Sequence, residues 1–121
     1  MSEPVESITL TATDPEDRKI ITLARASRAR AGADQGACVR DGDGRTYAAT
    51  SIRLESLSLS AIQLAVAMAI SSSAPGLEAV ALVADIDPTD LDLSLVREVA
   101  GSGVTVWVVG PDGAVRDRIE A

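Results

Sequence analysis

At 121 residues, 46% of them hydrophobic with one Trp and one Tyr, the chain has the size and composition of one domain with an aliphatic core. Its net charge is −7 and it holds only 11 Lys and Arg, so it lacks the clustered positive charge that binding to nucleic acid or an anionic membrane requires. One Cys excludes an intramolecular disulfide, no apolar leader follows Met1, and no apolar run is long enough to cross a bilayer. We therefore expect a cytoplasmic protein with neither nucleic acid nor a membrane as a partner.

The first predicted element is a helix. Residues 1–12 carry few structural signals, although residues 8–11 have the composition of a short edge strand. The helix begins after a cap at Thr13 or Asp14 and ends at Gly32. Its buried face repeats at i, i+3, i+4 and i+7, with Ile20, Leu23, Ala24 and Ser27.

A hairpin follows the helix. Residues 36–40 and 45–50 predict two strands, and the turn 41–44 joins them with two Asp-Gly pairs, which suit a tight hairpin turn. The same acidic residues resemble the start of a calcium loop. We favour the turn, because Ile52 stands where that loop needs a bidentate Glu.

The second half of the chain predicts helices that alternate with buried strands. Residues 58–70 predict a helix that is apolar on nearly every side, so it is either deep in the core or covered by another subunit. The later elements are a buried strand at 79–84, a helix from a cap at Thr89 or Asp90 to Gly101, a buried strand at 104–109, a turn at 110–113 and a strand at 114–119. The order α-β-β-α-β-α-β-β predicts an α/β fold with three layers, α-β-α, and a mixed sheet of about five strands, in a single domain of residues 1–121.

Four segments occur in an order and spacing that a known family shares. They are Gln35-Gly36-Ala37-Cys38, Asp43-Gly44-Arg45, Arg53-Leu54-Glu55 and residues 80–85. In that order they resemble a Val-Gly-Ala-Ala strand, an Asp-Gly-Arg turn, a strand ending in Asn-x-Glu and the third strand of the cytidine deaminase family. The resemblance runs from about Thr22 to Asp112 and implies the cytidine deaminase-like fold.

The same resemblance shows what the sequence lacks. The family activates water on a zinc ion held by three His or Cys side chains, while a Glu shuttles protons. The family's first motif is Cys-Ala-Glu, and counted from Glu55 its place holds Leu64-Ala65-Val66. The second motif is Pro-Cys-x-x-Cys. With Pro88 as the matching proline, Thr89 and Asp92 stand in place of its two cysteines. The whole chain contains no His and a single Cys, so three nitrogen or sulfur ligands are not available. We predict no catalytic residue, no metal and no cofactor, with Leu64 and Val66 filling the former site.

Two residues remain as candidates for ligand binding, and the resemblance supplies both. Glu55 matches the family glutamate that hydrogen-bonds the ribose, and Arg53 stands in place of the ribose-contacting Asn. An arginine there could bind an anionic ligand through two parallel hydrogen bonds, or it could pair with Glu55 or a subunit neighbour and fill the pocket. We favour the second interpretation. Ala33 stands in place of the family's pyrimidine-stacking Phe, so that contact is also absent.

Other polar groups have a structural and a functional interpretation. Four carboxylates surround the start of the third helix and could bind a divalent cation, but such residues more often cap a helix: Asp85, Asp87, Asp90 and Asp92. Cys38 lies in a predicted strand with no His to activate it, so we expect a buried small hydrophobe.

The sequence therefore predicts a catalytically degenerate relative of cytidine deaminase. Whether it is an enzyme at all stays open, and the missing ligands favour that it is not. Our first hypothesis is an oligomeric scaffold or interaction protein whose partner is a second copy of itself, as a homodimer or homotetramer. The alternative is a nucleoside- or nucleotide-binding sensor, or a residual nucleoside-processing enzyme, that uses Arg53 and Glu55.

Overall fold

A five-stranded mixed sheet forms the middle layer of the protein, which we describe from a computed structural model covering residues 11–121. The strand order is β2-β1-β5-β6-β7, and only β5 and β6 are parallel neighbours. The bounds are β1 Gln35–Asp41, β2 Thr46–Thr50, β5 Leu77–Ala84, β6 Thr105–Val109 and β7 Val115–Glu120. The edge strand predicted at residues 8–11 lies outside the described residues, apart from Thr11, which is in no strand.

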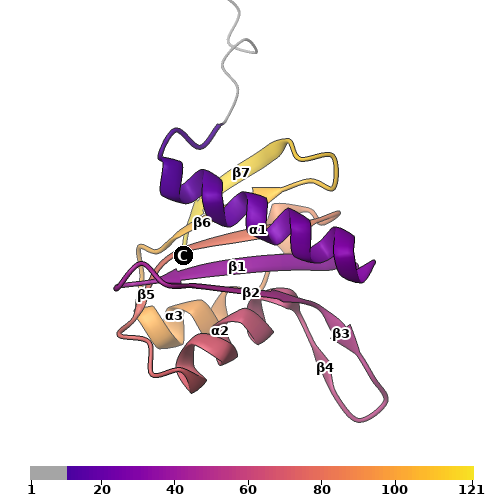
Figure 1. Cartoon of the computed structure of the whole chain (residues 1–121), viewed down its shortest axis with the longest axis horizontal. Coiled ribbons are helices and arrows are strands. Elements are labelled where there is room, and N and C mark those ends of the chain that lie inside the picture. Colours follow the sequence, from indigo (N-terminus) through magenta and orange to yellow (C-terminus); the bar gives the residue numbers. More distant parts are fainter. Residues whose placement is uncertain (1–10) are drawn as a thin grey trace, which may run out of the picture.

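Helices cover both faces of this sheet (Figure 1). Helix α1 (Pro15–Ala31) packs on one face, and α2 (Ala61–Ser71) and α3 (Ser94–Ala100) pack on the other. Each face has its own cluster of buried apolar side chains, so the core has two halves separated by the sheet. The predicted three-layer α/β fold and the mixed five-stranded sheet are confirmed, and no helix among residues 11–121 is long and apolar enough to cross a membrane.

Helix α1 begins and ends where its capping residues predict. The Asp14 carboxylate accepts a hydrogen bond from the Glu16 N–H at 2.8 Å, and Gly32 closes the helix in the left-handed conformation with φ 63°. Its buried face differs by one residue from the prediction, because Ile21 is buried and Leu23 only half-buried. A glycine at position 36 lets α1 approach β1, since a Cβ there would collide with the Ala24 carbonyl oxygen.

The β1–β2 hairpin turns as predicted. Asp41 is fully buried, and its Oδ1 accepts the backbone N–H groups of Asp43 and Arg45 at 2.9 Å each. Its Oδ2 accepts the hydroxyl of Tyr47 at 2.8 Å. The carboxylate is thus occupied by the turn itself, which agrees with a hairpin turn rather than a calcium loop.

The chain between the hairpin and α2 differs from the prediction. A two-stranded ribbon, β3 (Ile52–Arg53) and β4 (Ser58–Leu59), projects from the body of the protein (Figure 1), and α2 begins at Ala61 rather than at residue 58. The late start has a local cause, because Ser60 forms a capping box with Gln63 that fixes the first helical residue as Ala61.

The predicted third helix is also shorter than expected. Pro88–Asp90 form only a 3-10 turn, η2, and α3 begins at Ser94 instead of after Thr89 or Asp90. Leu91 is the reason, since its extended backbone (φ −78°, ψ 127°) interrupts the helical path between the two pieces. The prediction was wrong about where this helix starts and right about its end near Gly101.

Candidate functional site

The start of α2 is the place where the family resemblance implies the first zinc ligand and the proton-shuttling Glu. The Ser60 hydroxyl oxygen accepts the Gln63 N–H at 3.1 Å, and the Gln63 side-chain oxygen accepts the Ser60 N–H at 2.8 Å. Gln35, at the start of β1, accepts the Ala61 N–H at 3.1 Å through its side-chain oxygen. Two of the N–H groups in the first turn are therefore bound by the protein's own side chains.

Because α2 begins at Ala61, the residues that open the helix differ from those matched to the family motif by counting from Glu55. Leu64, Ala65 and Val66 lie in the second turn of the helix, with Val66 fully buried and Leu64 half-buried against the core. By position in the helix, the opening turn is Ala61-Ile62-Gln63. Neither segment contains a His, a Cys or a carboxylate, so no zinc ligand or proton acceptor stands there in either register.

The residues that the resemblance matches to the family's second metal-binding motif lie around η2 and the start of α3. Asp87 accepts the backbone N–H of Thr89 at 3.0 Å and its hydroxyl at 2.9 Å, and Asp92 accepts the Ser94 N–H at 2.9 Å. These hydrogen bonds, the backbone ones first, lower the pKa of both carboxyl groups. Asp85 contacts Arg116 at 3.6 Å instead. Asp87 thus caps η2, and Asp92 binds the first N–H of α3 from the residue before its N-cap, Leu93. No group of three His, Cys, Asp or Glu side chains within residues 11–121 is placed to hold a metal ion.

The one cysteine of the chain, Cys38, lies on the face of the sheet opposite to α2. Cys38 packs with Ile20, Ile21 and Ala24 of α1, whereas α2 packs on the opposite face. The thiol is fully buried, and desolvation by burial raises its pKa to about 11. Cys38 is thus out of reach of α2, and the chain holds no His and no other Cys, so the residues present do not fit a zinc ion.

The two predicted ligand-binding residues do not share a site. Arg53 pairs with Asp34 at 3.1 Å, and both side chains are exposed. Glu55 lies in the turn that connects β3 to β4, where the Leu54 N–H donates to the Leu57 carbonyl at 2.8 Å. Arg53 lines two hollows at this end of the sheet and Glu55 lines neither.

These hollows adjoin the start of α2 and the end of β5. The larger one, about 530 Å³, is lined by Arg28, Asp34, Gln35, Arg53, Ala84, Asp85 and Ile86. The smaller one, about 210 Å³, is lined by Gln35, Ser51, Arg53, Ser58, Leu59 and Ser60. Gln35 borders both, and sequence reasoning did not single it out as a site residue. The available signal was the polar Gln35 at the place where the family strand begins with Val.

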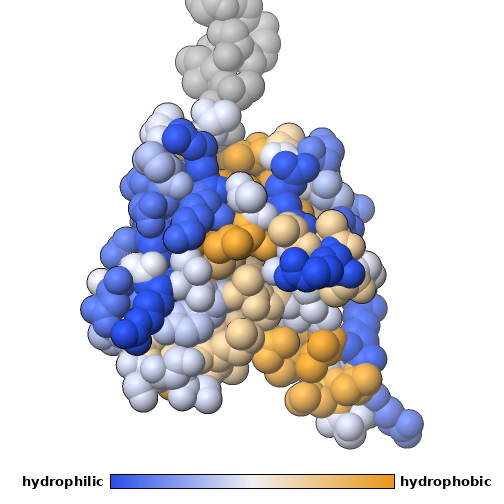
Figure 2. Space-filling model, viewed as in Figure 1, coloured by the Kyte–Doolittle hydropathy of each residue, from blue (hydrophilic) through white to orange (hydrophobic). Residues whose placement is uncertain are grey.

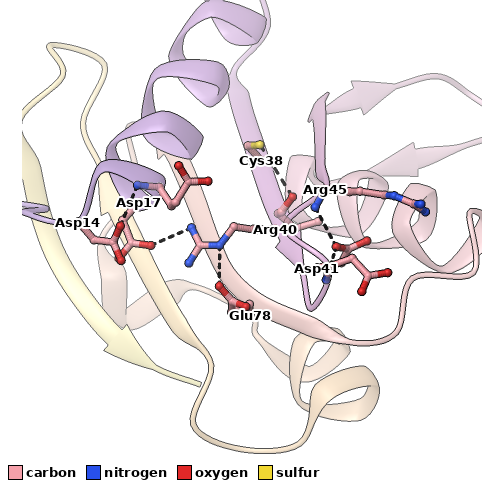
Figure 3. A network of polar contacts seen from close by, with 10 residues as sticks. Asp14, Asp17, Cys38, Arg40, Asp41, Arg45 and Glu78 are labelled. Carbon is pink, nitrogen blue, oxygen red and sulfur yellow. Dashed lines mark hydrogen bonds and ion pairs between the residues drawn. The ribbon is translucent and has the colours of Figure 1, made fainter.

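A second polar network lies away from this end, between α1 and the sheet (Figure 3). Arg40 of β1 is buried, and its guanidinium donates to Asp17 of α1 at 3.0 Å and to Glu78 of β5 at 2.8 Å. Both partners are carboxylates, so the one positive charge is fully compensated. The network joins α1, β1 and β5, and its contacts are those of a structural ion-pair network.

The fold is a three-layer α/β protein with a mixed five-stranded sheet, and the comparisons specify the family. The sequence model of the cytidine deaminase-like family matches residues 13–113, so the chain belongs to that family. Among solved structures, cytidine deaminase from Burkholderia pseudomallei is similar with a TM-score of 0.73 and 19% identity, covering 85% of this chain and 91% of that one. Cytidine deaminase from Mycobacterium tuberculosis is similar with a TM-score of 0.65 and 23% identity, covering 77% and 85% of the two chains. No curated protein sequence matches significantly.

Proposed function

We propose that this chain is a degenerate member of its family, without zinc-dependent deaminase activity, that acts as an oligomeric scaffold or interaction protein. The observation that carries the proposal is the start of α2. Gln35 and Ser60 cap it, and its first two residues, the apolar Ala61 and Ile62, are buried. A metal site needs free donor atoms at that place, and here the polar atoms are engaged in holding the helix.

The chemical part of the proposal is tested by metal analysis and by an activity assay. Zinc in the purified chain is measured after dialysis, and cytidine turnover is measured with and without added zinc. We expect far less than one zinc per chain and no turnover above the buffer rate. One tightly bound zinc per chain, or zinc-dependent turnover, would overturn the proposal.

The scaffold part of the proposal is supported by the surface around α2. Residues 56–77 contain no Asp, Glu, Lys or Arg, in a chain of which 24% is charged. All the large hydrophobic side chains that are exposed within residues 11–121 lie in or beside this stretch: Leu54 at 62%, Leu57 at 47%, Met68 at 38% and Ile70 at 51%. Apolar surface gathered on one layer is typical of a protein interface. We expect a homodimer or homotetramer, and sedimentation equilibrium at micromolar concentration measures it; a stable monomer would contradict this part.

The larger hollow beside Arg53 supports the second candidate, a sensor for a nucleoside or nucleotide. Arg28 and Arg53 both line it beside Asp34, to which each is bonded, and a phosphate would bind by taking the place of these contacts. A thermal-shift screen of nucleosides and nucleotides tests this function. Stabilisation that Arg53→Ala abolishes would support it. Glu55→Ala serves as the comparison, because Glu55 lies outside the hollow and its replacement is expected to change nothing.

A further inference from the structure

Another hollow lies on the face of the sheet that α1 covers, opposite to α2. It has a volume of about 270 Å³ and is lined by Arg25, Ala26, Arg28, Ala29, Val83 and Pro111. The first four belong to the second half of α1, Val83 lies at the end of β5, and Pro111 follows β6. The hollow is thus at the carboxyl end of the parallel pair β5 and β6, the edge at which open α/β sheets bind ligands. Figure 2 shows hydrophilic side chains next to apolar surface along α1, which crosses the front of the molecule in this view.

Glycine makes room for both arginines of this hollow. The Arg25 guanidinium lies where a Cβ at position 113 would be, so the β6–β7 turn accommodates it because that residue is Gly113. The Arg28 side chain begins against Gly36 in the same way, and its Nε–H donates to the Asp34 carbonyl oxygen at 3.1 Å. Side chains that are already held in place lose less conformational entropy when they bind a ligand.

The charges of Arg25 and Arg28 are not compensated by ion pairs within residues 11–121. The carboxylates at this edge are engaged elsewhere: Asp34 with Arg53, Asp85 with Arg116 and Asp112 with the Ala114 N–H. The negative end of the helix dipole accounts for Arg28 and Arg30 in the last turn of α1, but not for Arg25. Because Arg25 and Arg28 are three residues apart on the helix, their charges repel one another, and an anion in the hollow compensates both.

We propose that this hollow binds a small organic carboxylate with an apolar body. A guanidinium matches a carboxylate through two parallel hydrogen bonds, and the four other lining residues are apolar and accept the body. The size of the hollow limits the ligand, because pockets for drug-sized molecules and cofactors have volumes of about 300 to 1,000 Å³. An aromatic acid of the size of benzoate suits it better than a nucleotide does. The site is separate from the proposed functions, since Arg25 lines neither hollow beside Arg53.

Titration with benzoate, followed by nuclear magnetic resonance, tests the site. The Nε–H signals of Arg25 and Arg28 and the methyl signals of Ala26, Ala29 and Val83 are expected to move together, with one Kd in the millimolar range. Acetate has the carboxylate without the apolar body, and benzamide has the body without the charge. Each is expected to bind about ten times more weakly than benzoate. An equal response to acetate or benzamide, or no movement of these signals with benzoate, would overturn the proposal.

Two variants change the hollow in different ways. Arg25→Met removes one guanidinium, whereas Ala26→Leu fills the hollow with hydrocarbon and keeps both charges. Each is expected to weaken benzoate binding about tenfold. Arg30→Met is the matched control on the same helix, because Arg30 is exposed and outside the hollow, and its affinity is expected to stay unchanged.

All three substituted positions are exposed, and Met and Leu are good helix formers, so the variants are expected to fold, as circular dichroism verifies. Unchanged affinity in Arg25→Met or in Ala26→Leu, or an equal loss in Arg30→Met, would show that benzoate binds as a counter-ion of the surface and would overturn the site. The nucleotide screen with Arg53→Ala depends on a different hollow, so the failure of either experiment is distinguishable from that of the other.

Discussion

Substitution of Gln35 tests whether the residues at the start of α2 serve as structural caps of the helix. Gln35→Ala removes the acceptor of the Ala61 N–H, a half-buried bond of 3.1 Å between residues far apart in the sequence. A net hydrogen bond of this kind contributes about 1 kcal/mol to the free energy of unfolding. Ser60→Ala removes the N-cap of the same turn, which contributes about 1 kcal/mol more. The double variant is expected to lose about 2 kcal/mol, somewhat less if the frayed turn accounts for both losses.

Urea unfolding at one fixed protein concentration measures these changes, because oligomer stability depends on concentration. With a slope near 2 kcal/mol per molar urea, each single change lowers the midpoint by about 0.5 M. Gln35→Glu is the matched control. It keeps a side-chain oxygen at the same place and adds a negative charge at the N-terminal end of α2, so its midpoint is expected to stay or rise by a few tenths molar. If Gln35→Ala unfolds at the wild-type midpoint, the side chain is not a structural cap, and the conversion of the site is refuted at this residue.

Three other changes follow from the buried polar groups. Arg40→Met leaves Asp17 of α1 uncompensated and is expected to lower the free energy of unfolding by about 2 kcal/mol. Arg53→Met, at the exposed pair with Asp34, is expected to change it by less than about 0.5 kcal/mol in the same urea titration. Burial alone would raise the pKa of Asp41, but hydrogen bonds from Tyr47 and the turn N–H groups lower it below its ordinary value. The ionised carboxylate therefore stabilises the fold above a pH of about 4, and this stabilisation is lost as the pH falls below that value. Asp41→Asn should accordingly weaken the dependence of the free energy of unfolding on pH in the acid range. Cys38, with a pKa of about 11, is expected to react with a thiol reagent only in urea, and rapid labelling of the folded chain would contradict its burial.

The layers of the fold were predictable because each main element carries its own local signal. The cap at Asp14 and the αL glycine at Gly32 mark both ends of α1, and the uninterrupted apolar run at 79–84 marks a strand buried on both faces. The β3–β4 ribbon carries no such signal. Its strands, Ile52–Arg53 and Ser58–Leu59, have only two residues each, and the second is separated from the apolar helix α2 by Ser60 alone.

The candidate site was less predictable, because contacts distant in sequence determine it. The Gln35 cap joins residues separated by 26 positions, and the bonds of Arg40 join residues separated by 23 and 38. No local pattern encodes such pairs. Composition did settle one point without any structure, since a chain with no His and one Cys cannot supply three nitrogen or sulfur ligands, wherever its elements fall.

Helix caps and a bound metal ion can both satisfy polar groups at the start of a helix and connect it to neighbouring elements. A bound metal contributes to folding wherever its ligands come from separate elements, so loss of its ligands alone would leave polar groups unsatisfied and the elements disconnected. In this chain Gln35 connects β1 to α2 directly, and Asp87 and Asp92 satisfy the chain that precedes α3. The elements around the former site are therefore held by the protein's own hydrogen bonds. This arrangement supports the proposed function, in which the fold is held without a metal and the uncharged outer face of α2 serves association.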